Sequence, residues 1–379
     1  MPRFSKSIVF FLLLISSSGH CQTSKGINIR SLKFIGEYDI PFNLIFKETT
    51  VGGLSGIDYD KKNDLYYFIC DDRSAINPAR FYSARIKITE KGIDTIAFQD
   101  LKFLLQQNGE TYPSAKQDMS HTIDPESLRF DPTKNQIIWT SEGERVVKSN
   151  PPILINPSIN VSDLGGKFVD TFPIPSILSM QATESGPHQN GGFEGVTFDP
   201  DFRTMYVAME EPLYEDGPLA DVTSTKSWTR IFSYDVSTKK NLTQYAYGLE
   251  PVAHPATPAT AFKINGISEI LSLGNKKLLT VERSFSTGNL GCAIKVFIAD
   301  LGNATHVEKT KSMNETQPKH PVSKKLLFNM DDLRIFIDNI EGVTFGPDLP
   351  NGHKTLIFVS DNNFNPLEKM QLLLFEVIP

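Results

Sequence analysis

The chain has 379 residues, of which 40% are hydrophobic, so it can bury a sizeable core. Its formal net charge is −6 and no basic stripe runs along it, which argues against a nucleic-acid partner. Length alone would favour two or three domains, although some repeat folds run this long as a single unit.

The N-terminus predicts an export signal. Basic residues precede an apolar run over 8–15, small residues follow over 16–19, and the run is too short to span a membrane. We therefore expect residues 1–21 to be a signal peptide and the protein to be secreted or periplasmic. Lipid attachment at Cys21 is the alternative, but His20 does not suit the small residue that such processing prefers. No later segment is apolar enough to span a membrane.

One short phrase recurs along the rest of the chain. In each copy a polar or acidic residue is followed by glycine or serine and then by alternating apolar residues. The copies lie at 54–60, 125–131, 193–199, 264–269 and 340–346. The second residue of each phrase is, in order, Ser55, Glu126, Glu194, Asn265 and Glu341, with spacings of 71, 68, 71 and 76 residues. A regular period of this size is typical of a repeat architecture.

Each phrase predicts a strand, because its apolar residues alternate with a period of two. A turn and a second apolar strand follow in every repeat, and each second strand ends in an acid, namely Asp71, Glu142, Glu210, Glu282 and Asp361. A third strand often follows after a loop of variable length. Helical periodicity is scarce, and residues 98–107 are the best candidate for a helix.

A repeat of three or four antiparallel strands fits a β-propeller blade. The chain beyond the last phrase, joined to the chain before the first, adds about one further period, so that strand 32–38 would pair with 372–377 and close the ring. We predict an all-β protein with one domain over residues 30–379 and five blades. Six blades would fit if the 145–190 region held two degenerate ones.

Two cysteines remain after the signal segment, Cys70 and Cys292. They lie in repeats far apart around the predicted ring, so we expect two independent, buried thiols instead of a disulfide.

Matched side chains from separate repeats should gather in two rings around the propeller axis, because the innermost strands line a central channel. The second residues of the phrases, Asn265 among them, would form one ring, and the acids that end the second strands would form the other. Carboxylates at close range raise one another's pKa, and a cation or a nearby arginine relieves the repulsion. Hard oxygen ligands favour calcium or magnesium. We predict a metal site, with calcium as the expected ion, formed by Asp71, Glu126, Glu194, Glu282, Glu341 and Asp361. The alternative is that these acids only accept backbone hydrogen bonds at the hairpin ends.

The repeats resemble a known family. The stretches 53–57 with 71–73, 190–199 with 210–211, 265–269 with 282–283, and 341–343 with 360–363 are similar to the phytase-like family described as having esterase-like activity. The resemblance covers roughly residues 45 to 375. It implies a secreted propeller-like domain that acts as a hydrolase. The longer calcium and phosphate motifs of the better-known propeller phytases are absent.

These features lead to a hypothesis of a secreted, metal-dependent hydrolase of phosphate or carboxylic esters. Glu210, Glu211 or Glu142 would act as general base, and Arg73 and Arg283 would bind the charge of a small anionic ester. The alternative is a non-catalytic propeller that binds a ligand or partner and holds a structural calcium. A monomer is expected. No Gly-x-Ser-x-Gly elbow is present, which disfavours a common serine esterase.

Overall fold

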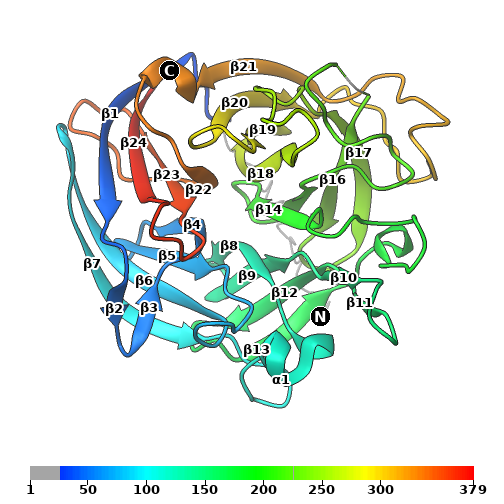
Figure 1. Ribbon diagram of the computed structural model, residues 1–379. Helices are drawn as coiled ribbons and strands as arrows, with labels where there is room; N and C mark the ends of the chain where they lie inside the picture. The colour runs from blue at the N-terminus through cyan, green and yellow to red at the C-terminus, as the bar shows by residue number, and fades with distance from the viewer. Residues whose placement is uncertain (1–25, 225) are drawn as a thin grey trace, which may run out of the picture.

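The computed structural model describes residues 26–224 and 226–379 as five four-stranded antiparallel sheets set around a central axis (Figure 1). The predicted signal peptide, with Cys21, lies outside the described residues. Within the described ranges, no helix has the length and apolarity that a membrane crossing requires.

Each sheet is one blade, and its innermost strand is the predicted repeat phrase. Blade 1 contains β4 (Leu54–Asp60), β5 (Leu65–Cys70), β6 (Arg80–Thr89) and β7 (Gly92–Phe103). Blade 2 contains β8 (Pro125–Asp131), β9 (Gln136–Ser141), β12 (Ser158–Asp163) and β13 (Phe168–Phe172). Blade 3 contains β14 (Phe193–Phe198), β15 (Thr204–Met209), β16 (Trp228–Asp235) and β17 (Asn241–Gly248).

Blade 4 contains β18 (Lys263–Gly274), β19 (Lys277–Ser286), β20 (Ala293–Asp300) and β21 (Ser323–Asn329). Blade 5 contains β22 (Asn339–Phe345), β23 (Thr355–Asp361), β24 (Met370–Ile378) and β1 (Ser31–Ile40). Short elements decorate the loops: hairpins β2 (Leu44–Phe46) with β3 (Thr49–Val51) and β10 (Glu144–Val146) with β11 (Ile153–Ile155), helix α1 (Ala115–Asp118), and 3-10 turns at Met119–His121, Ser176–Leu178 and Met330–Leu333.

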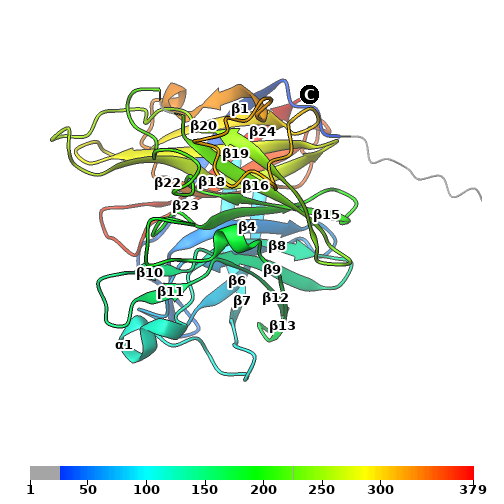
Figure 2. The same ribbon diagram turned by 90° about the vertical axis from the view of Figure 1, so that its right-hand side faces the viewer.

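The ring closes through strands from the two ends of the described chain. β1 pairs antiparallel with β24, from Ser31 opposite Ile378 to Ile40 opposite Met370. The two strands lie side by side in Figure 1, β1 in blue and β24 in red, and their labels stand together in the turned view of Figure 2. The predicted closure is therefore confirmed.

The apolar core lies between the blades and not at the axis. Five clusters of buried side chains each join two neighbouring blades; Leu279 and Phe358, for example, belong to the cluster between blades 4 and 5. Strands covered on both faces read as nearly continuous apolar runs, and β23 is buried along its whole length. Because these clusters bury the apolar side chains, the axis is left to polar groups.

The predicted helix over residues 98–107 is wrong: its first half belongs to β7, the outer strand of blade 1. A bulge at Gln99, where Ser83 pairs with Asp100 and Ala84 with Phe98, breaks the period of two and imitates helical spacing. The 145–190 region supplies the outer strands of blade 2, so five blades are confirmed over six.

The two cysteines are free, as predicted. Cys70 is buried at the end of β5, and Cys292 is half-buried just before β20.

Candidate active site at the mouth of the channel

A β-bulge interrupts each innermost strand at the same level. At this point the innermost strand has one residue more than the stretch of the second strand that it pairs with. The first residue left out of the ladder is, in blade order, Ser55, Glu126, Glu194, Ser268 and Glu341, and in blades 2 and 3 the following residue is also unpaired. Their spacings, taken from the residue numbers, are 71, 68, 74 and 73, more even than those of the sequence phrase.

A second ring lies one step above the first. In each blade the residue before the bulge pairs with a residue of the second strand, and the residue that follows this partner belongs to the second ring. The residues of the second ring are Asp71, Glu142, Glu210, Arg283 and Asp361. Four blades thus contribute an acid at this level, and blade 4 contributes an arginine.

The prediction that Glu282 and Asn265 join these rings is wrong. Ile267, the residue before the bulge, pairs with Glu282, so the ring positions of blade 4 fall to Ser268 and Arg283. Glu282 instead accepts hydrogen bonds from the Tyr247 hydroxyl at 2.8 Å and from Lys324 Nζ at 2.5 Å. Asn265 also donates to it, at 2.8 Å. Glu282 is therefore a fully partnered structural group, which leaves no place for it in a metal site.

The remaining predicted residues converge. A cavity of about 1030 Å³ at the mouth of the channel is lined by Asp71, Arg73, Glu126, Glu142, Glu194, Glu210, Glu211, Arg283 and Glu341, among others. Asp361 is buried close enough to Glu341 for each charge to affect the other. Carboxylates from blades 1, 2, 3 and 5 thus share one space.

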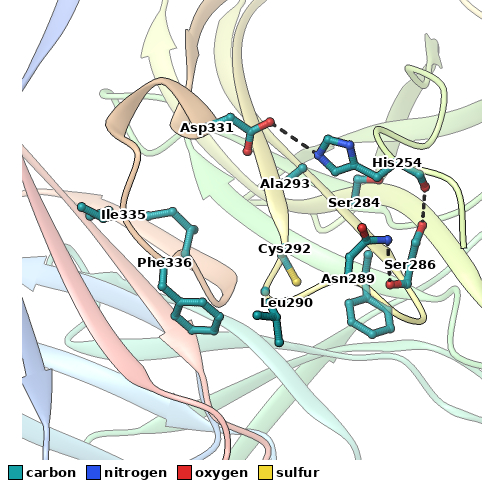
Figure 3. A pocket seen from close by; sticks show the side chains of 13 residues that line it. His254, Ser284, Ser286, Asn289, Leu290, Cys292, Ala293, Asp331, Ile335 and Phe336 are labelled. Carbon is teal, nitrogen blue, oxygen red and sulfur yellow. Dashed lines mark hydrogen bonds and ion pairs between the residues drawn. The ribbon is translucent and has the colours of Figure 1, made fainter. Parts of the chain in front are cut away.

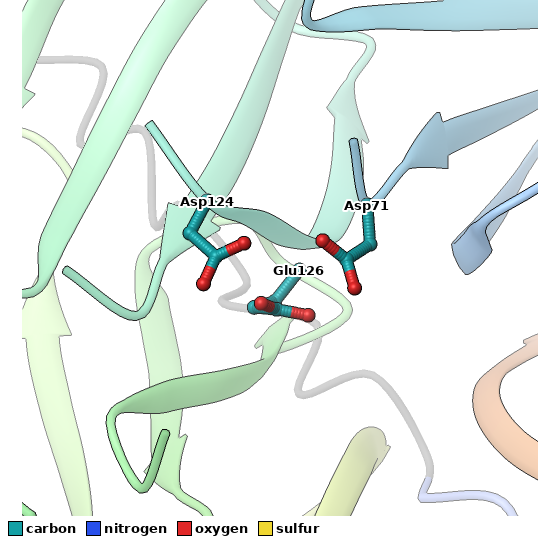
Figure 4. A group of neighbouring side chains, drawn as sticks. All are labelled: Asp71, Asp124 and Glu126. Atoms are coloured by element: carbon teal, nitrogen blue, oxygen red, sulfur yellow. The ribbon is translucent and has the colours of Figure 1, made fainter. Parts of the chain in front are cut away.

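Two groups of three carboxylates have the spacing that a cation requires. Oxygen atoms of Asp71, Asp124 and Glu126 all lie within 4.8 Å of one another, and so do those of Glu126, Glu142 and Glu194. Figure 4 shows the first group, with the three carboxyl groups turned toward a common point. Glu126 belongs to both groups and would bridge them. Sequence reasoning missed Asp124, whose only signal is its place directly before the second phrase.

The two predicted arginines lie within this acidic set. Arg73 forms ion pairs with Asp124 and, at 2.6 Å, with Glu144. Arg283 pairs with Glu210 at 2.6 Å and lies 3.7 Å from Glu341. Each arginine therefore offsets part of the negative charge of the cavity.

Two arginines do not balance so many acids. Burial, reinforced by the neighbouring carboxylates, raises the pKa values of Glu126, Glu142 and Glu194 well above the usual range. Burial also raises the pKa of Glu341 to about 7 and, together with the charge of Glu210, that of Glu211 to about 8. The cavity therefore favours either bound protons or a cation.

Arg129 crosses the channel below the rings. Its guanidinium donates to the carbonyl oxygens of Ile57, Ile270 and Val343, which belong to three different blades, at 2.7, 2.9 and 3.1 Å. It also pairs with Glu269 at 3.0 Å.

Glu269 directly follows the bulge residue of blade 4. The equivalent residue in blades 1, 3 and 5 is a glycine. A Cβ on Gly195 would meet Glu269 Oε1 at 2.8 Å, so glycine at that position leaves room for the buried carboxylate. The ion pair of Arg129 with Glu269 thus crosses the channel below the rings, and we call this pair the floor.

The fold and this cavity define a five-bladed β-propeller with a carboxylate-rich site at one end of its axis. The chain belongs to the phytase-like family, described as "esterase-like activity of phytase", which matches residues 49–364. No curated protein matches the chain.

Several solved structures are similar over most of the chain, at low identity. An endo-arabinase from Bacteroides thetaiotaomicron shares 13% identity with a TM-score of 0.44, covering 87% of this chain and 95% of its own. An α-L-arabinofuranosidase from Lactobacillus brevis shares 11% with a TM-score of 0.45, covering 86% and 91%. An exo-β-1,3-galactanase from Phanerochaete chrysosporium shares 10% with a TM-score of 0.46, covering 90% and 64%. Likeness at this level assigns no activity.

Proposed function

We propose that the protein is a metal-dependent hydrolase of phosphate or related esters, acting in the cavity at the channel mouth. The observation that carries this proposal is the pair of carboxylate groups that share Glu126, at the base of a cavity that also presents Arg73 and Arg283. We also propose that the protein is exported, on the basis of the apolar N-terminal run; N-terminal sequencing of the natively produced protein tests this.

The chemistry of the donor groups fits a hard divalent cation. Glu341 Oε2 and Asp361 Oδ2 are buried and accept no hydrogen bond from the described residues, so both oxygens are free to act as metal ligands near the site. Asp71, Asp124 and Glu126 would hold one ion, and Glu126, Glu142 and Glu194 a second. Carboxylate oxygens suit calcium, the ion we propose. Such an ion, when bound, polarises a phosphoryl or acyl oxygen and lowers the pKa of a coordinated water.

The surrounding side chains would divide the remaining work. Arg73 and Arg283 would orient the negative charge of the ester, since a guanidinium matches the geometry of a phosphate or carboxylate. Of the three predicted bases, Glu210 is engaged by Arg283, and Glu142 accepts the backbone N–H of Gly192 at 3.0 Å. We therefore assign the general base to Glu211, which lines the same cavity.

One observation favours a second function, that of a non-catalytic binding propeller with a structural cation. Both arginines already pair with acids, Arg73 with Asp124 and Glu144 and Arg283 with Glu210, so neither carries free positive charge. In that case the cation would complete the acidic rings, and the cavity would bind a ligand without turning it over.

Hydrolysis of p-nitrophenyl phosphate and p-nitrophenyl acetate, each with calcium and with EDTA, separates the two functions. We expect calcium-dependent release of p-nitrophenol from at least one ester. Glu211→Gln should lower kcat by about 100-fold, the usual contribution of a general base. Glu282→Gln is the matched control, because that carboxylate is buried away from the cavity, and it should retain activity. Turnover that neither EDTA nor Glu211→Gln affects would refute the proposed mechanism.

A further inference from the structure

The wall of the cavity has two chemically different sides. Blades 1 and 2 supply charged groups, among them Asp71, Arg73 and Glu142. Blades 4 and 5 and the loops beside them also supply charged groups, such as Lys263 and Glu368. Most of the large apolar side chains that line the cavity come from this side, with one residue from blade 3: Leu219, Phe262, Phe285, Leu290, Phe336 and Leu367. The carboxylate rings therefore adjoin an apolar wall.

The apolar side chains of this wall are strongly exposed. Leu290 is 94% exposed, Leu367 86% and Phe262 63%, the three highest values among the large hydrophobic residues of the described chain. Single exposed apolar residues are ordinary on a protein surface, but a group that lines one cavity indicates a binding site. The wall thus offers apolar contact at the point where a ligand would enter.

The local backbone holds Leu290 in this position. It lies in the turn between β19 and β20, where the N–H of Asn289 donates to the Ser286 carbonyl at 3.1 Å. The N–H of Cys292 donates to the Ile337 carbonyl at 2.9 Å. Gly291, at φ +69°, permits this approach, because a Cβ there would lie 2.3 Å from the Ile337 oxygen. Figure 3 shows Leu290, Cys292 and Phe336 gathered at one end of the adjoining pocket.

Leu367 is held in a similar way in the loop between β23 and β24. Its N–H donates to Asn365 Oδ1 at 3.1 Å, and Asn365 Nδ2 donates to Glu368 Oε1 at 2.8 Å. The side chain is thus presented to the cavity by an internally bonded loop.

The length of the blade 4 hairpin explains why the apolar wall extends beyond the level of the rings. The pairing of β18 with β19 continues past the ring level, as far as Lys263 opposite Ser286. This extension carries Phe262 and Phe285 above the rings, with their ring centroids 6.2 Å apart. The same extension displaced the predicted ring positions in this blade, so one feature accounts for both observations.

We propose that the cavity takes an amphiphilic ester: a phosphate or similar anionic head bound over the carboxylate rings, joined to an alkyl or aryl group that packs against Phe262, Leu290 and Leu367. The proposal rests on the proposed function for the head group and adds the class of the organic group. It disfavours a polyol carrying several phosphates, because such a substrate would leave the apolar wall exposed to water.

A matched pair of substrates tests this proposal. With calcium present, and below the micellar concentration of the longer ester, octyl phosphate should show a kcat/KM about 10-fold or more above that of methyl phosphate, because the chain is desolvated against the wall. Leu290→Ser and Phe262→Ser should each reduce this preference, by lowering kcat/KM for octyl phosphate more than that for methyl phosphate. Leu326→Ser, on the exposed face of β21 and 48% exposed, is the matched control and should change neither rate. Equal rates for the two esters would overturn the proposal.

Binding separates failure of this proposal from failure of the proposed function. Octylphosphonate and methylphosphonate present the same head group and need no turnover. Calorimetry on the calcium-loaded protein should give tighter binding of octylphosphonate, by about 10-fold or more, and Leu290→Ser should reduce the difference. This result would support the apolar site even if no ester were hydrolysed. Equal affinities for the two phosphonates would overturn it even in an active hydrolase.

Discussion

The channel contains two regions with buried carboxylates, and the regions differ in whether neighbouring groups satisfy the carboxylate oxygens. In the floor, both oxygens of Glu269 are satisfied: Ser127 donates to Oε2 at 2.8 Å, the N–H of Ile270 donates to Oε1 at 2.8 Å, and Arg129 completes the pair. In the rings above, two arginines face a larger number of acids, and buried oxygens of Glu341 and Asp361 have no hydrogen-bond donor among the described residues.

This difference indicates which carboxylates are structural. A buried charge with a complete set of partners holds the blades together, whereas a group of like charges with unused oxygens is costly unless something else binds there. The rings, not the floor, are therefore the region where a cation and a substrate are expected.

The largest expected effect comes from removing the Arg129–Glu269 ion pair of the floor. Arg129→Met should lower the free energy of unfolding by about 3–5 kcal/mol, because it leaves Glu269 buried and unpaired. Urea unfolding measures the loss, and added calcium should not restore it, since Arg129 lies outside the carboxylate groups. A loss below about 1 kcal/mol would show that the floor is not the structural tie between blades.

Calcium should stabilise the rings. At a concentration 100 times its Kd, one ion bound only to the folded state contributes about 2.7 kcal/mol. Thermal unfolding of the wild type should shift upward with calcium, and Glu126→Gln should remove most of the shift because Glu126 serves both carboxylate groups. An equal shift in the wild type and the variant would mean that calcium binds elsewhere.

The pH dependence of stability should weaken when the cation binds. In its absence, Glu341 and Glu211, with pKa values of about 7 and 8, hold protons that the unfolded chain releases at lower pH. Stability is then greatest in acid and falls as the pH rises toward 8, by up to about 1.4 kcal/mol per pH unit for each group. Denaturant unfolding from pH 5 to 8 should show this fall in EDTA and a flatter profile in calcium. A rise in stability over this range in EDTA would contradict the account.

The smallest effect concerns Glu282. Glu282→Gln should cost about 1 kcal/mol, since it weakens the hydrogen bonds with Tyr247 and Lys324. The stabilisation by calcium should persist in this variant, because the carboxylate lies outside the cavity. Loss of that stabilisation would return Glu282 to the metal site and overturn its assignment as a structural group.

The spacing of the repeat phrase was enough to predict five blades, ring closure, and the ring acids of blades 1, 2, 3 and 5, because equivalent residues in equivalent strands meet at a common axis. Blade 4 was misaligned, since Asn265 and Gly266 imitate the Glu-Gly pairs while the bulge stands three residues later, at Ser268. A longer inner hairpin, not a change of motif, causes this difference, and a phrase-by-phrase alignment does not reveal it.

The floor could not be predicted for a different reason. Arg129 and Glu269 are 140 residues apart, and their contact depends on glycine at positions such as Gly195 in another blade. Asp124 was missed because it lies before the strand, in a loop whose path is set by the fold. These groups depend on how the blades pack, which the local pattern of the sequence does not record.

Calorimetric titration of calcium into the wild type, Glu126→Gln and Glu282→Gln determines whether carboxylates from separate blades form one cation site. The account predicts saturable binding to the wild type and to Glu282→Gln, and binding at least about 10-fold weaker to Glu126→Gln, since one charged ligand is lost. Absence of binding to the wild type, or equal affinity in all three proteins, would contradict it.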